Sequence, residues 1–223
     1  KLSTVKTVNG KKPVFFGLDA KNDFYAKNIK NSGDGKVLAT LCFDNNNIDV
    51  EIPAIGTYMV TNALAAAAAG KLLGLTDEEI ANGVASYKTV GSRANVINTG
   101  KIKIIDDCYN ANPTSVRASL DTLSNLDGRK VAILGDMKEL GSEELKLHFD
   151  TGVYAKLKDI GTVITVGGLA KGLAKGADGK AFDTIEDAKP EILKTIKSGD
   201  VVLVKASHSM QFENIVEFLK QNF

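Results

Sequence analysis

Two different rhythms of apolar and polar residues divide the chain near residue 91. In the first part, short apolar or alternating stretches are separated by the turn-forming runs KNSGDG and DNNN. This pattern predicts strands at 13–17, 37–43 and 48–53. Because no helix is expected before residue 56, these strands alone offer little for an independent core. Residues 1–91 therefore either dock against the second part of the chain or belong to a larger domain.

Two helices are expected to follow these strands, at 56–75 and 76–87. The five consecutive alanines Ala65 to Ala69 would let another backbone approach the first helix closely. Thr76 and Glu79 have the spacing of a capping box, which predicts the start of the second helix.

After residue 91, continuous apolar strands alternate with amphipathic helices. The strands are expected at 102–107, 130–135, 162–166 and 200–206. The helices are expected at 114–125, 142–157, 168–176, 185–197 and 209–221. Such alternation is typical of a parallel sheet covered on both faces. Residues 92–223 are therefore predicted to form an α/β, Rossmann-like domain with a mostly parallel sheet.

Composition narrows the classes of partner. The chain has 223 residues, 28 of them basic and 27 acidic, and a net charge of +1, which gives no electrostatic case for binding nucleic acid or a membrane surface. No apolar run approaches the length of a transmembrane helix, and the first residues lack the apolar core of a signal peptide. Cys42 and Cys108 are the only cysteines, too few for a disulfide scaffold, and a cytoplasmic location is expected.

The most informative polar cluster follows the strand at 102–107. Asp107 stands at the strand exit, where a carboxylate can accept hydrogen bonds from two ribose hydroxyls. Tyr109, Asn110 and Asn112 follow in the loop, and Pro113 suits the first turn of the next helix. Ligands of open parallel sheets bind beyond the carboxyl ends of the strands, so this loop is a candidate site.

Two further strand ends carry polar residues. Asp136 follows the glycine that ends the strand at 130–135 and is expected to point outward. Lys205, Ser207 and His208 follow the last strand and lead into a helix whose N-terminus would attract anions. One such turn alone would be read as an ordinary helix connection with a capping Asp or Asn. Three polar strand ends in one domain favour a functional cleft.

Several other chemistries have weaker support. Asp106 and Asp107 should point to opposite faces of their strand and so cannot chelate a metal as a pair, and no metal site is assigned. Cys108 lies beside two acidic residues that should raise its pKa and make it inert. Gly167, Gly168 and Gly172 lack the G-x-G spacing of a dinucleotide fingerprint, which favours a loop or helix-start role.

A phosphate-binding P-loop is absent from the sequence. Five Gly-Lys pairs begin at residues 10, 35, 70, 100 and 179, and none is followed by Ser or Thr.

Several motifs together resemble the Mur ligase family. They are IIDDCYNANPTSVRASLDTL, VAILGDMKELG and VVLVKASHSM, preceded by NALAAAAAGKLLGL and GSRANV, and in this order they span most of residues 13–223. That family has a domain for the UDP-sugar, a central ATPase-like domain with the P-loop, and a Rossmann-like C-terminal domain. The resemblance implies that residues 1–91 are the last part of the central domain and residues 92–223 the C-terminal domain.

The resemblance also implies roles for individual residues. Asn62 matches the family asparagine near adenine, whose N6/N7 edge an amide can pair with. Arg93 matches the nucleotide-contacting arginine at the domain junction, and Asp107 the ribose-binding aspartate. Without the resemblance, Asn62 would be read as a helix cap and Arg93 as a surface charge.

A second set of residues is expected to face the incoming amine and the acyl phosphate. Its members are Tyr109, Asn110, Asn112, Asp136, Lys205 and Ser207. No catalytic residue is assigned within this chain.

The chain departs from the family pattern in two places. Tyr58-Met59 replaces a histidine-asparagine or histidine-methionine pair. The usual K-G-S-R reads Lys205-Ala206-Ser207-His208, which loses a guanidinium able to hold a carboxylate bidentately.

The activity implied is ATP-dependent amide ligation through an acyl phosphate. The implied substrates are UDP-N-acetylmuramoyl-tripeptide and D-alanyl-D-alanine, with ATP and Mg²⁺ bound mainly outside this chain, which is expected to be monomeric and inactive alone. Another Mur or folylpolyglutamate-type ligase, a non-catalytic nucleotide- or peptide-binding domain, and an NAD-dependent Rossmann oxidoreductase are the alternatives.

Overall fold

The structure is a computed structural model that describes residues 4–32, 35–89 and 91–223. The chain divides into two compact units, Lys1–Lys88 and Thr89–Phe223, here called unit 1 and unit 2. Each has a hydrophobic core of its own.

Unit 1 contains a three-stranded antiparallel sheet in the order β1-β2-β3. The strands are β1 (Tyr25–Ser32), β2 (Lys36–Phe43) and β3 (Asn46–Ile52). Asp44 and Asn45 join β2 to β3, and both have positive φ angles, 47° and 61°. Two such residues in succession form a type I′ turn, whose twist matches that of the strands. The DNNN run therefore fixes the register of this hairpin.

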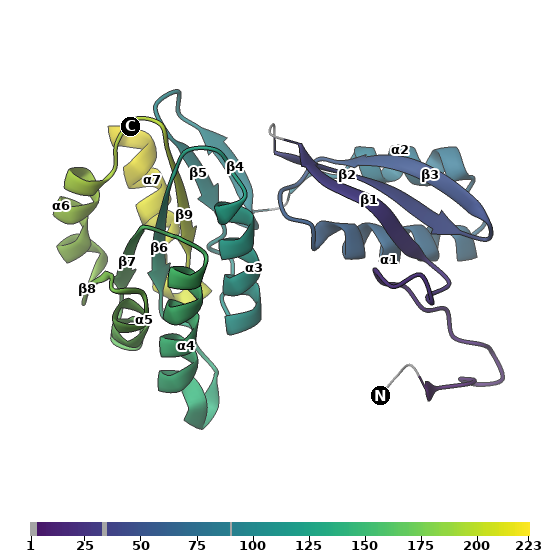
Figure 1. Cartoon of the computed structure of the whole chain (residues 1–223), viewed down its shortest axis with the longest axis horizontal. Helices are drawn as coiled ribbons and strands as arrows, with labels where there is room; N and C mark the ends of the chain where they lie inside the picture. Colours follow the sequence, from purple (N-terminus) through teal and green to yellow (C-terminus); the bar gives the residue numbers. More distant parts are fainter. Residues whose placement is uncertain (1–3, 33–34, 90) are drawn as a thin grey trace. The chain divides into compact units, whose positions relative to one another are not determined.

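Two helices, α1 (Met59–Leu72) and α2 (Asp77–Ala85), cover one face of this sheet (Figure 1). Buried Ala63 and Ala67 of α1 join Leu41 and Ile52 of the sheet in the core. The capping box of α2 is confirmed: the Glu79 amide donates to Thr76 Oγ1 at 3.2 Å, and the Thr76 amide donates to Glu79 Oε2 at 2.8 Å.

The strand expected at 13–17 is wrong. Phe16 forms a single isolated bridge with Phe24, and the first strand is β1. Half of the residues of β1, YAKNIKNS, are exposed, and the strand has a register irregularity between Lys27 and Lys30. Lysines and irregular pairing are typical of edge strands, and they remove the apolar alternation from which a strand is predicted.

Unit 2 contains a six-stranded sheet in the order β4-β5-β9-β6-β7-β8. The strands are β4 (Asn95–Asn98), β5 (Lys103–Asp106), β6 (Arg129–Gly135), β7 (Thr162–Val166), β8 (Lys180–Phe182) and β9 (Asp200–Lys205). Only the β4–β5 pair is antiparallel; every other pair is parallel. The predicted α/β class with a mostly parallel sheet is confirmed.

Helices cover both faces of this sheet, as expected for parallel strands (Figure 1). The helices α6 (Ile185–Thr195) and α7 (Glu213–Asn222) pack against one face, over a core that includes Ile104, Ile133 and Val204. The helices α3 (Pro113–Ser124), α4 (Glu144–Leu157) and α5 (Ala170–Ala177) lie over the other face. Short 3₁₀ helices, η2 (Gly141–Glu143) and η3 (His208–Met210), precede α4 and α7.

Glycines let α4 and α5 pack with their backbones in contact. A Cβ atom on Gly152 of α4 would lie 2.0 Å from the Leu173 carbonyl oxygen, and one on Gly176 of α5 would lie 2.3 Å from that of Phe149. Gly172 lies in the first turn of α5, so the expected helix-start role is confirmed, and it also faces α4. A side chain at Gly152 or Gly176 would force the two helices apart.

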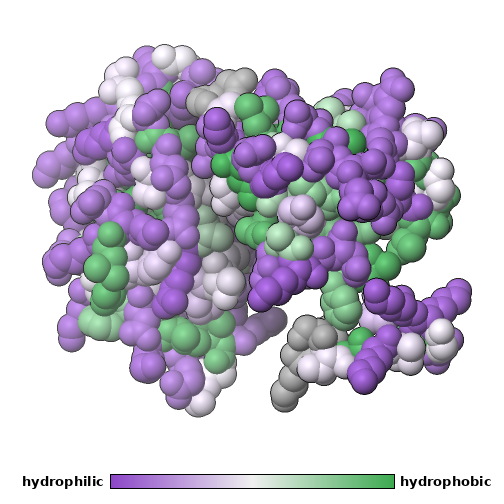
Figure 2. Space-filling model, turned by 45° about the vertical axis from the view of Figure 1, so that its right-hand side comes forward, coloured by the Kyte–Doolittle hydropathy of each residue, from purple (hydrophilic) through white to green (hydrophobic). Residues whose placement is uncertain are grey.

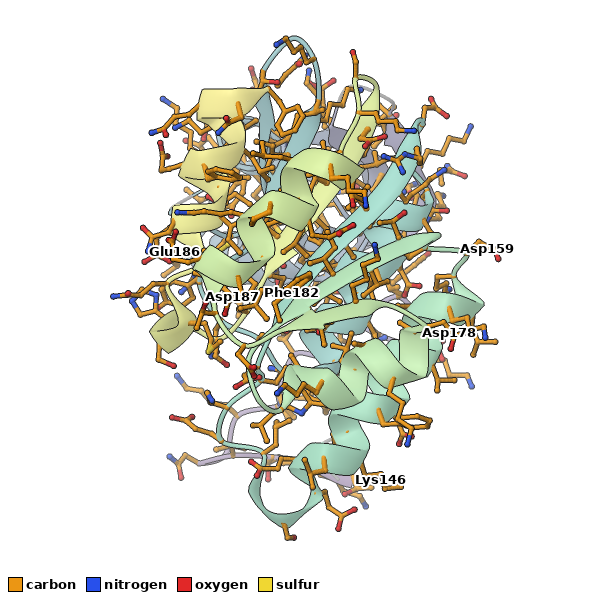
Figure 3. The ribbon with its side chains drawn as sticks, turned by 90° about the vertical axis from the view of Figure 1, so that its left-hand side faces the viewer. Lys146, Asp159, Asp178, Phe182, Glu186 and Asp187 are labelled. Carbon is orange, nitrogen blue, oxygen red and sulfur yellow. The ribbon has the colours of Figure 1, made fainter. Side chains whose placement is uncertain are left out.

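The start of α6 and the end of α5 are visible at the sheet edge formed by β8 (Figure 3). Thr184 caps α6 by accepting the Asp187 amide at 3.2 Å, and Glu186 and Asp187 lie in the first turn, where acidic side chains are stabilised by the helix dipole. Asp178, with a φ of 53°, ends α5 in the left-handed conformation.

The short edge strands β4 and β8 were not predicted, because four- and three-residue segments carry too little periodicity to detect. In the ranges described, no helix combines the length and the apolar composition that crossing a membrane requires. Hydrophilic side chains dominate the face seen in Figure 2, with hydrophobic ones in small separate areas.

Candidate functional site

The three polar strand ends lie at the same edge of the sheet of unit 2. They follow β5, β9 and β6, which are adjacent parallel strands in the centre of the sheet. The chain moves outward across the sheet from β6 through β7 to β8, and then returns to the centre, where β9 lies between β5 and β6. The order of the strands therefore reverses beside β9. In open α/β sheets this is the position at which ligands bind.

Asp107 is a hydrogen-bonding centre in this edge. Its Oδ1 accepts the Ala94 amide at 3.1 Å, and its Oδ2 accepts the Ser119 hydroxyl at 2.7 Å. Oδ2 also lies 2.6 Å from Lys205 Nζ. The carboxylate therefore joins the loop before β4, the helix α3 and the end of β9. Ser119 was not anticipated, although it lies one helical turn after Ser115 on the same face of α3.

Lys205 is almost completely buried, with 3% of its side chain exposed, against 13% for Asp107. Besides the carboxylate, its ammonium group donates to the Asn110 carbonyl oxygen at 2.9 Å. An ammonium group removed from water is stable only when it is paired and hydrogen-bonded, and both conditions are met. Lys205 thereby closes the β5–α3 loop onto the last strand.

An exposed aromatic residue supports Arg93. The guanidinium carbon of Arg93 lies 3.8 Å from the ring centroid of Tyr109, which is 50% exposed. The Tyr109 amide donates to the Ser92 carbonyl oxygen at 2.9 Å, which joins the two loops through their backbones. The exposed His208 ring lies 6.0 Å from the Tyr109 ring on a third loop. A cation stacked on an aromatic face is oriented while it remains accessible.

The two asparagines of the loop have different surroundings. Asn112 caps α3: its Oδ1 accepts the Ser115 amide at 2.9 Å, and Ser115 Oγ accepts the Asn112 amide at 3.1 Å. Asn110 is exposed, and its Oδ1 accepts the Ala111 amide at 2.8 Å. The expected Pro113 start of the helix is confirmed.

Asp136 does not point outward as expected. It is 4% exposed, and its Oδ1 accepts the Ala170 amide at 2.8 Å at the start of α5. Its Oδ2 lies 2.8 Å from Lys138 Nζ. A Cβ atom on Gly167 would lie 2.4 Å from Asp136 Oδ1, so only glycine leaves room for this carboxylate. Its described contacts are those of a residue that holds α5 against β6.

Ser207 connects the ends of β9 and β6. It is 4% exposed, and its Oγ accepts the Lys138 amide at 2.8 Å. Its own amide donates to the Asp136 carbonyl oxygen at 3.1 Å. The loops that follow β5, β6 and β9 are thus joined by hydrogen bonds, and Arg93, Tyr109, Asn110 and His208 are left at the surface.

A buried histidine of α4 accepts a hydrogen bond from the backbone of the loop after β6. His148 of α4 has no exposed surface; its Nε2 lies 2.9 Å from the Met137 amide nitrogen and its Nδ1 lies 2.7 Å from the Glu144 carbonyl oxygen. Because Nε2 accepts, the ring is neutral with its proton on Nδ1. Nothing in the sequence pattern indicated this role, because His148 lies eleven residues beyond the amide it binds.

Asn62 belongs to unit 1. It lies exposed in the first turn of α1, where its Nδ2 approaches Met59 Sδ at 3.4 Å, and it does not cap the helix. It lines a mostly apolar groove of about 450 Å³ between α1 and α2. Other groove residues include Ala66, Gly70, Glu79, Gly83 and Tyr87.

Asp106 and Asp107 have separate partners. Asp106 Oδ1 accepts the Cys108 amide at 3.4 Å, whereas Asp107 binds Ala94, Ser119 and Lys205. Among the described residues, no cluster of three or more acidic, histidine or cysteine side chains has the arrangement of a metal site. The pKa of the buried Cys108 thiol is raised, mainly by burial and then by Asp106, so burial rather than charge is the larger cause.

Two family models match the sequence. The model described as "Mur ligase, glutamate ligase domain" matches residues 92–208, and the one described as "Mur ligase middle domain" matches residues 2–70.

Among curated relatives, the UDP-N-acetylmuramoyl-tripeptide--D-alanyl-D-alanine ligase of Bacillus subtilis (strain 168) is 34% identical over 215 residues, 92% of this chain and 46% of the relative. The ligase of the same name from Escherichia coli (strain K12) is 33% identical, over 91% of this chain and 46% of the relative. The chain thus spans about half the length of the curated relatives it matches.

Solved structures agree with these matches. A crystal structure of MurF from Acinetobacter baumannii has a TM-score of 0.86 and 30% identity, and covers 93% of this chain and 46% of the other. MurF ligase from Thermotoga maritima, solved in complex with ADP, has a TM-score of 0.82 and 28% identity, over 94% of this chain and 48% of the other. The matched models, which together cover most of each unit, show that the chain belongs to the Mur ligase family.

Proposed function

We propose that this chain is the part of an ATP-dependent amide ligase that completes the adenosine site and positions the amine substrate. The reaction joins D-alanyl-D-alanine to UDP-N-acetylmuramoyl-tripeptide. The observation that carries the proposal is the meeting of three hydrogen-bonded polar loops at the carboxyl ends of the adjacent strands β5, β9 and β6. The named relatives and the ADP-bound structural neighbour support the same assignment.

In this reaction the terminal carboxylate of the tripeptide takes the γ-phosphoryl group of ATP and becomes an acyl phosphate. The dipeptide amine then attacks the acyl carbon, an amide bond forms, and phosphate leaves. Holding the amine close to the acyl carbon supplies much of the rate enhancement of such a step. Residues of this chain would bind and orient the substrates. Arg93 and Asp107 would contact the nucleotide, and Tyr109 and Asn110 would contact the dipeptide.

The buried residues have a supporting part in the proposal. Lys205, Ser207, Asp136 and Asn112 would hold the loops in place, because their polar atoms are engaged with other protein groups. Asn62 would contact adenine from unit 1. Mg²⁺ would be bound mainly by parts of the ligase outside this chain, along with the triphosphate, where it would neutralise charge on the phosphates. The ligase would act as a monomer in the cytoplasm and would bind neither nucleic acid nor membrane.

Activity measurements test this proposal directly. The 223-residue chain is expected to release no ADP when given ATP, Mg²⁺, the UDP-linked tripeptide and D-alanyl-D-alanine, because its sequence contains no P-loop. A protein of the relatives' full length that includes this chain is expected to release ADP only when both peptide substrates are present. Magnesium-dependent ADP release by the short chain would contradict the first expectation.

A substrate panel on the longer protein separates this ligase from its alternatives. Turnover with folate and glutamate in place of the peptide substrates would identify a folylpolyglutamate-type ligase. Saturable binding of NAD by calorimetry would instead favour an oxidoreductase. Nucleotide binding without any turnover would indicate a non-catalytic domain.

A further inference from the structure

The hydrogen-bonding capacity of Asp107 is almost fully used within the protein. A carboxylate has about four acceptor positions, two on each oxygen. The single proton of the Ser119 hydroxyl has two acceptors in reach, Asp107 Oδ2 at 2.7 Å and the Ser115 carbonyl oxygen at 2.9 Å, and the nearer, charged oxygen is the stronger acceptor. Oδ2 also accepts from Lys205 Nζ at 2.6 Å, and Oδ1 accepts from the Ala94 amide at 3.1 Å. These three internal donors leave one position on Oδ1. A ligand can therefore place one hydroxyl on Asp107, and not the pair of hydroxyls that the sequence suggested.

The internal donors also determine where that position points. Oδ2 is held from two sides by a helix side chain and a strand-end side chain, both nearly buried: Ser119 is 6% exposed, and Lys205 has 3% of its side chain exposed. With Oδ2 fixed, rotation of the carboxylate would break a charge-assisted bond of 2.6 Å. Oδ1 is thereby kept on the side of Ala94, next to Arg93.

The Ala94 contact transmits this constraint to the adjacent residue. Ala94 has a φ of 53°, a conformation that a residue with a Cβ rarely adopts unless other contacts hold it. The bond from its amide to Asp107, with the bond from the Tyr109 amide to Ser92, fixes the backbone on both sides of Arg93. Arg93 lies stacked on Tyr109 in this arrangement.

We propose that Ser119 and Lys205 are positioning residues that hold Asp107 so that it keeps the Arg93 loop in place and offers a single acceptor position to one hydroxyl of the ligand. This inference rests on the proposed function in that the ligand is taken to be the ribose of ATP. Ser119 and Lys205 do not contact the ligand themselves; they act through Asp107.

Ser119→Ala is the variant that tests the inference with least disturbance. It removes one donor to Asp107 and leaves every charge in place. Thr122→Val in the same helix is the matched control, because Thr122 is 7% exposed and its hydroxyl donates to the Ala118 carbonyl oxygen at 2.9 Å. Lys205→Arg, which keeps the charge, is a second variant. Lys205→Met is less suitable because it leaves the Asp107 charge unpaired and can prevent folding.

The first measurement needs no catalytic activity. In the 223-residue chain, amide hydrogen exchange at Ala94 is expected to be faster in Ser119→Ala than in the unchanged chain, and unaltered in Thr122→Val. Equal exchange at Ala94 in Ser119→Ala and the unchanged chain would overturn the positioning role, whatever ligand the site binds.

The second measurement uses a ligase of the relatives' full length with ATP, 2′-deoxy-ATP and 3′-deoxy-ATP. Loss of one hydrogen bond predicts that Ser119→Ala raises the KM for ATP by roughly 3- to 10-fold, with a smaller change in kcat. The ratio of the KM of Ser119→Ala to that of the unchanged protein is expected to be the same with one deoxy analogue as with ATP. It is expected to be near one with the analogue that lacks the hydroxyl bound to Asp107.

The outcomes separate the inference from the proposed function. Two results would overturn the single-hydroxyl assignment while ligation itself continues. One is a KM ratio near one for all three nucleotides, and the other is a KM ratio near one for both deoxy analogues. Absence of ligation in the unchanged full-length protein would contradict the proposed function, and the hydrogen-exchange result would still decide the positioning role. Recovery of the normal KM in Ser119→Thr, which restores a hydroxyl, would support the hydrogen bond as the cause.

Discussion

At the scale of single residues, the molecule combines exposed side chains that can meet a ligand with buried ones that keep them oriented. Arg93 and Tyr109 are exposed, whereas Lys205 and Asp136 are almost completely buried. The sequence marks both kinds in the same way, as polar residues after an apolar strand. Burial tells them apart, because a buried charge must have partners inside the protein.

The Asp107–Lys205 pair gives a stability prediction. Asp107→Asn removes the carboxylate and leaves the Lys205 ammonium buried without its counter-charge, which is expected to lower the free energy of unfolding by about 3 kcal/mol or more. Asp121→Asn is the control: its ion pair with Lys158 is partly exposed, the amide oxygen can still accept the Tyr154 hydroxyl, and loss of the charge should cost less than about 1 kcal/mol. Urea unfolding followed by circular dichroism measures both. Equal losses would show that burial of the Asp107 pair is unimportant.

The candidate residues were predictable to different extents for physical reasons. Strand ends at 107, 136 and 205 follow from apolar runs that stop at polar residues, and strand order makes them neighbours. The partners Ala94, Ser119 and Lys138 were not predictable, because their roles depend on which loops meet across the sheet. The inward direction of Asp136 was missed for the same reason, since it depends on the start of α5.

At the scale of helices and strands, packing distance sets which sequence changes are tolerated. The α4–α5 contact has no room for side chains at Gly152 and Gly176. Long apolar segments such as β6 and β9 were correctly predicted because both faces of a central strand are buried. The exposed edge strand β1 and the short strands β4 and β8 lack that signature, so they were missed.

Two glycine substitutions distinguish close helix packing from helix propensity. Gly176→Ala places a Cβ atom 2.3 Å from the Phe149 carbonyl oxygen and is expected to destabilise unit 2 by about 1–3 kcal/mol or more. Gly83→Ala, at an exposed position of α2 with no atom within 4 Å of the new Cβ, is expected to stabilise unit 1 by about 0.5–1 kcal/mol. Thermal unfolding of the two variants should shift in opposite directions, and a common shift would contradict this explanation.

At the scale of the whole molecule, the chain consists of two bodies with separate cores. One core lies between the three-stranded sheet and α1 and α2, and the other lies between the six-stranded sheet and its helices. The change of rhythm near residue 91 predicts two domains, and the compact units of the structure are Lys1–Lys88 and Thr89–Phe223. The two family models match separate parts of the chain.

Separate cores predict separate unfolding. Residues 89–223 expressed alone are expected to fold and to unfold cooperatively, because all six strands of their sheet and all five covering helices lie within that range. Differential scanning calorimetry of this segment should give a transition that is also present in the 223-residue chain. A segment without a cooperative transition would show that its core needs residues from unit 1.

The position of β9 has a consequence for how the second unit is made. It is the last strand in the sequence, yet it separates β5 from β6 in the middle of the sheet. During synthesis, everything from residue 89 to 199 can leave the ribosome while the centre of the sheet is still open, with the edges of β5 and β6 unpaired. The nascent chain is therefore exposed to wrong strand pairing until residues 200–205 emerge, and a chaperone that shields those edges would act during that interval.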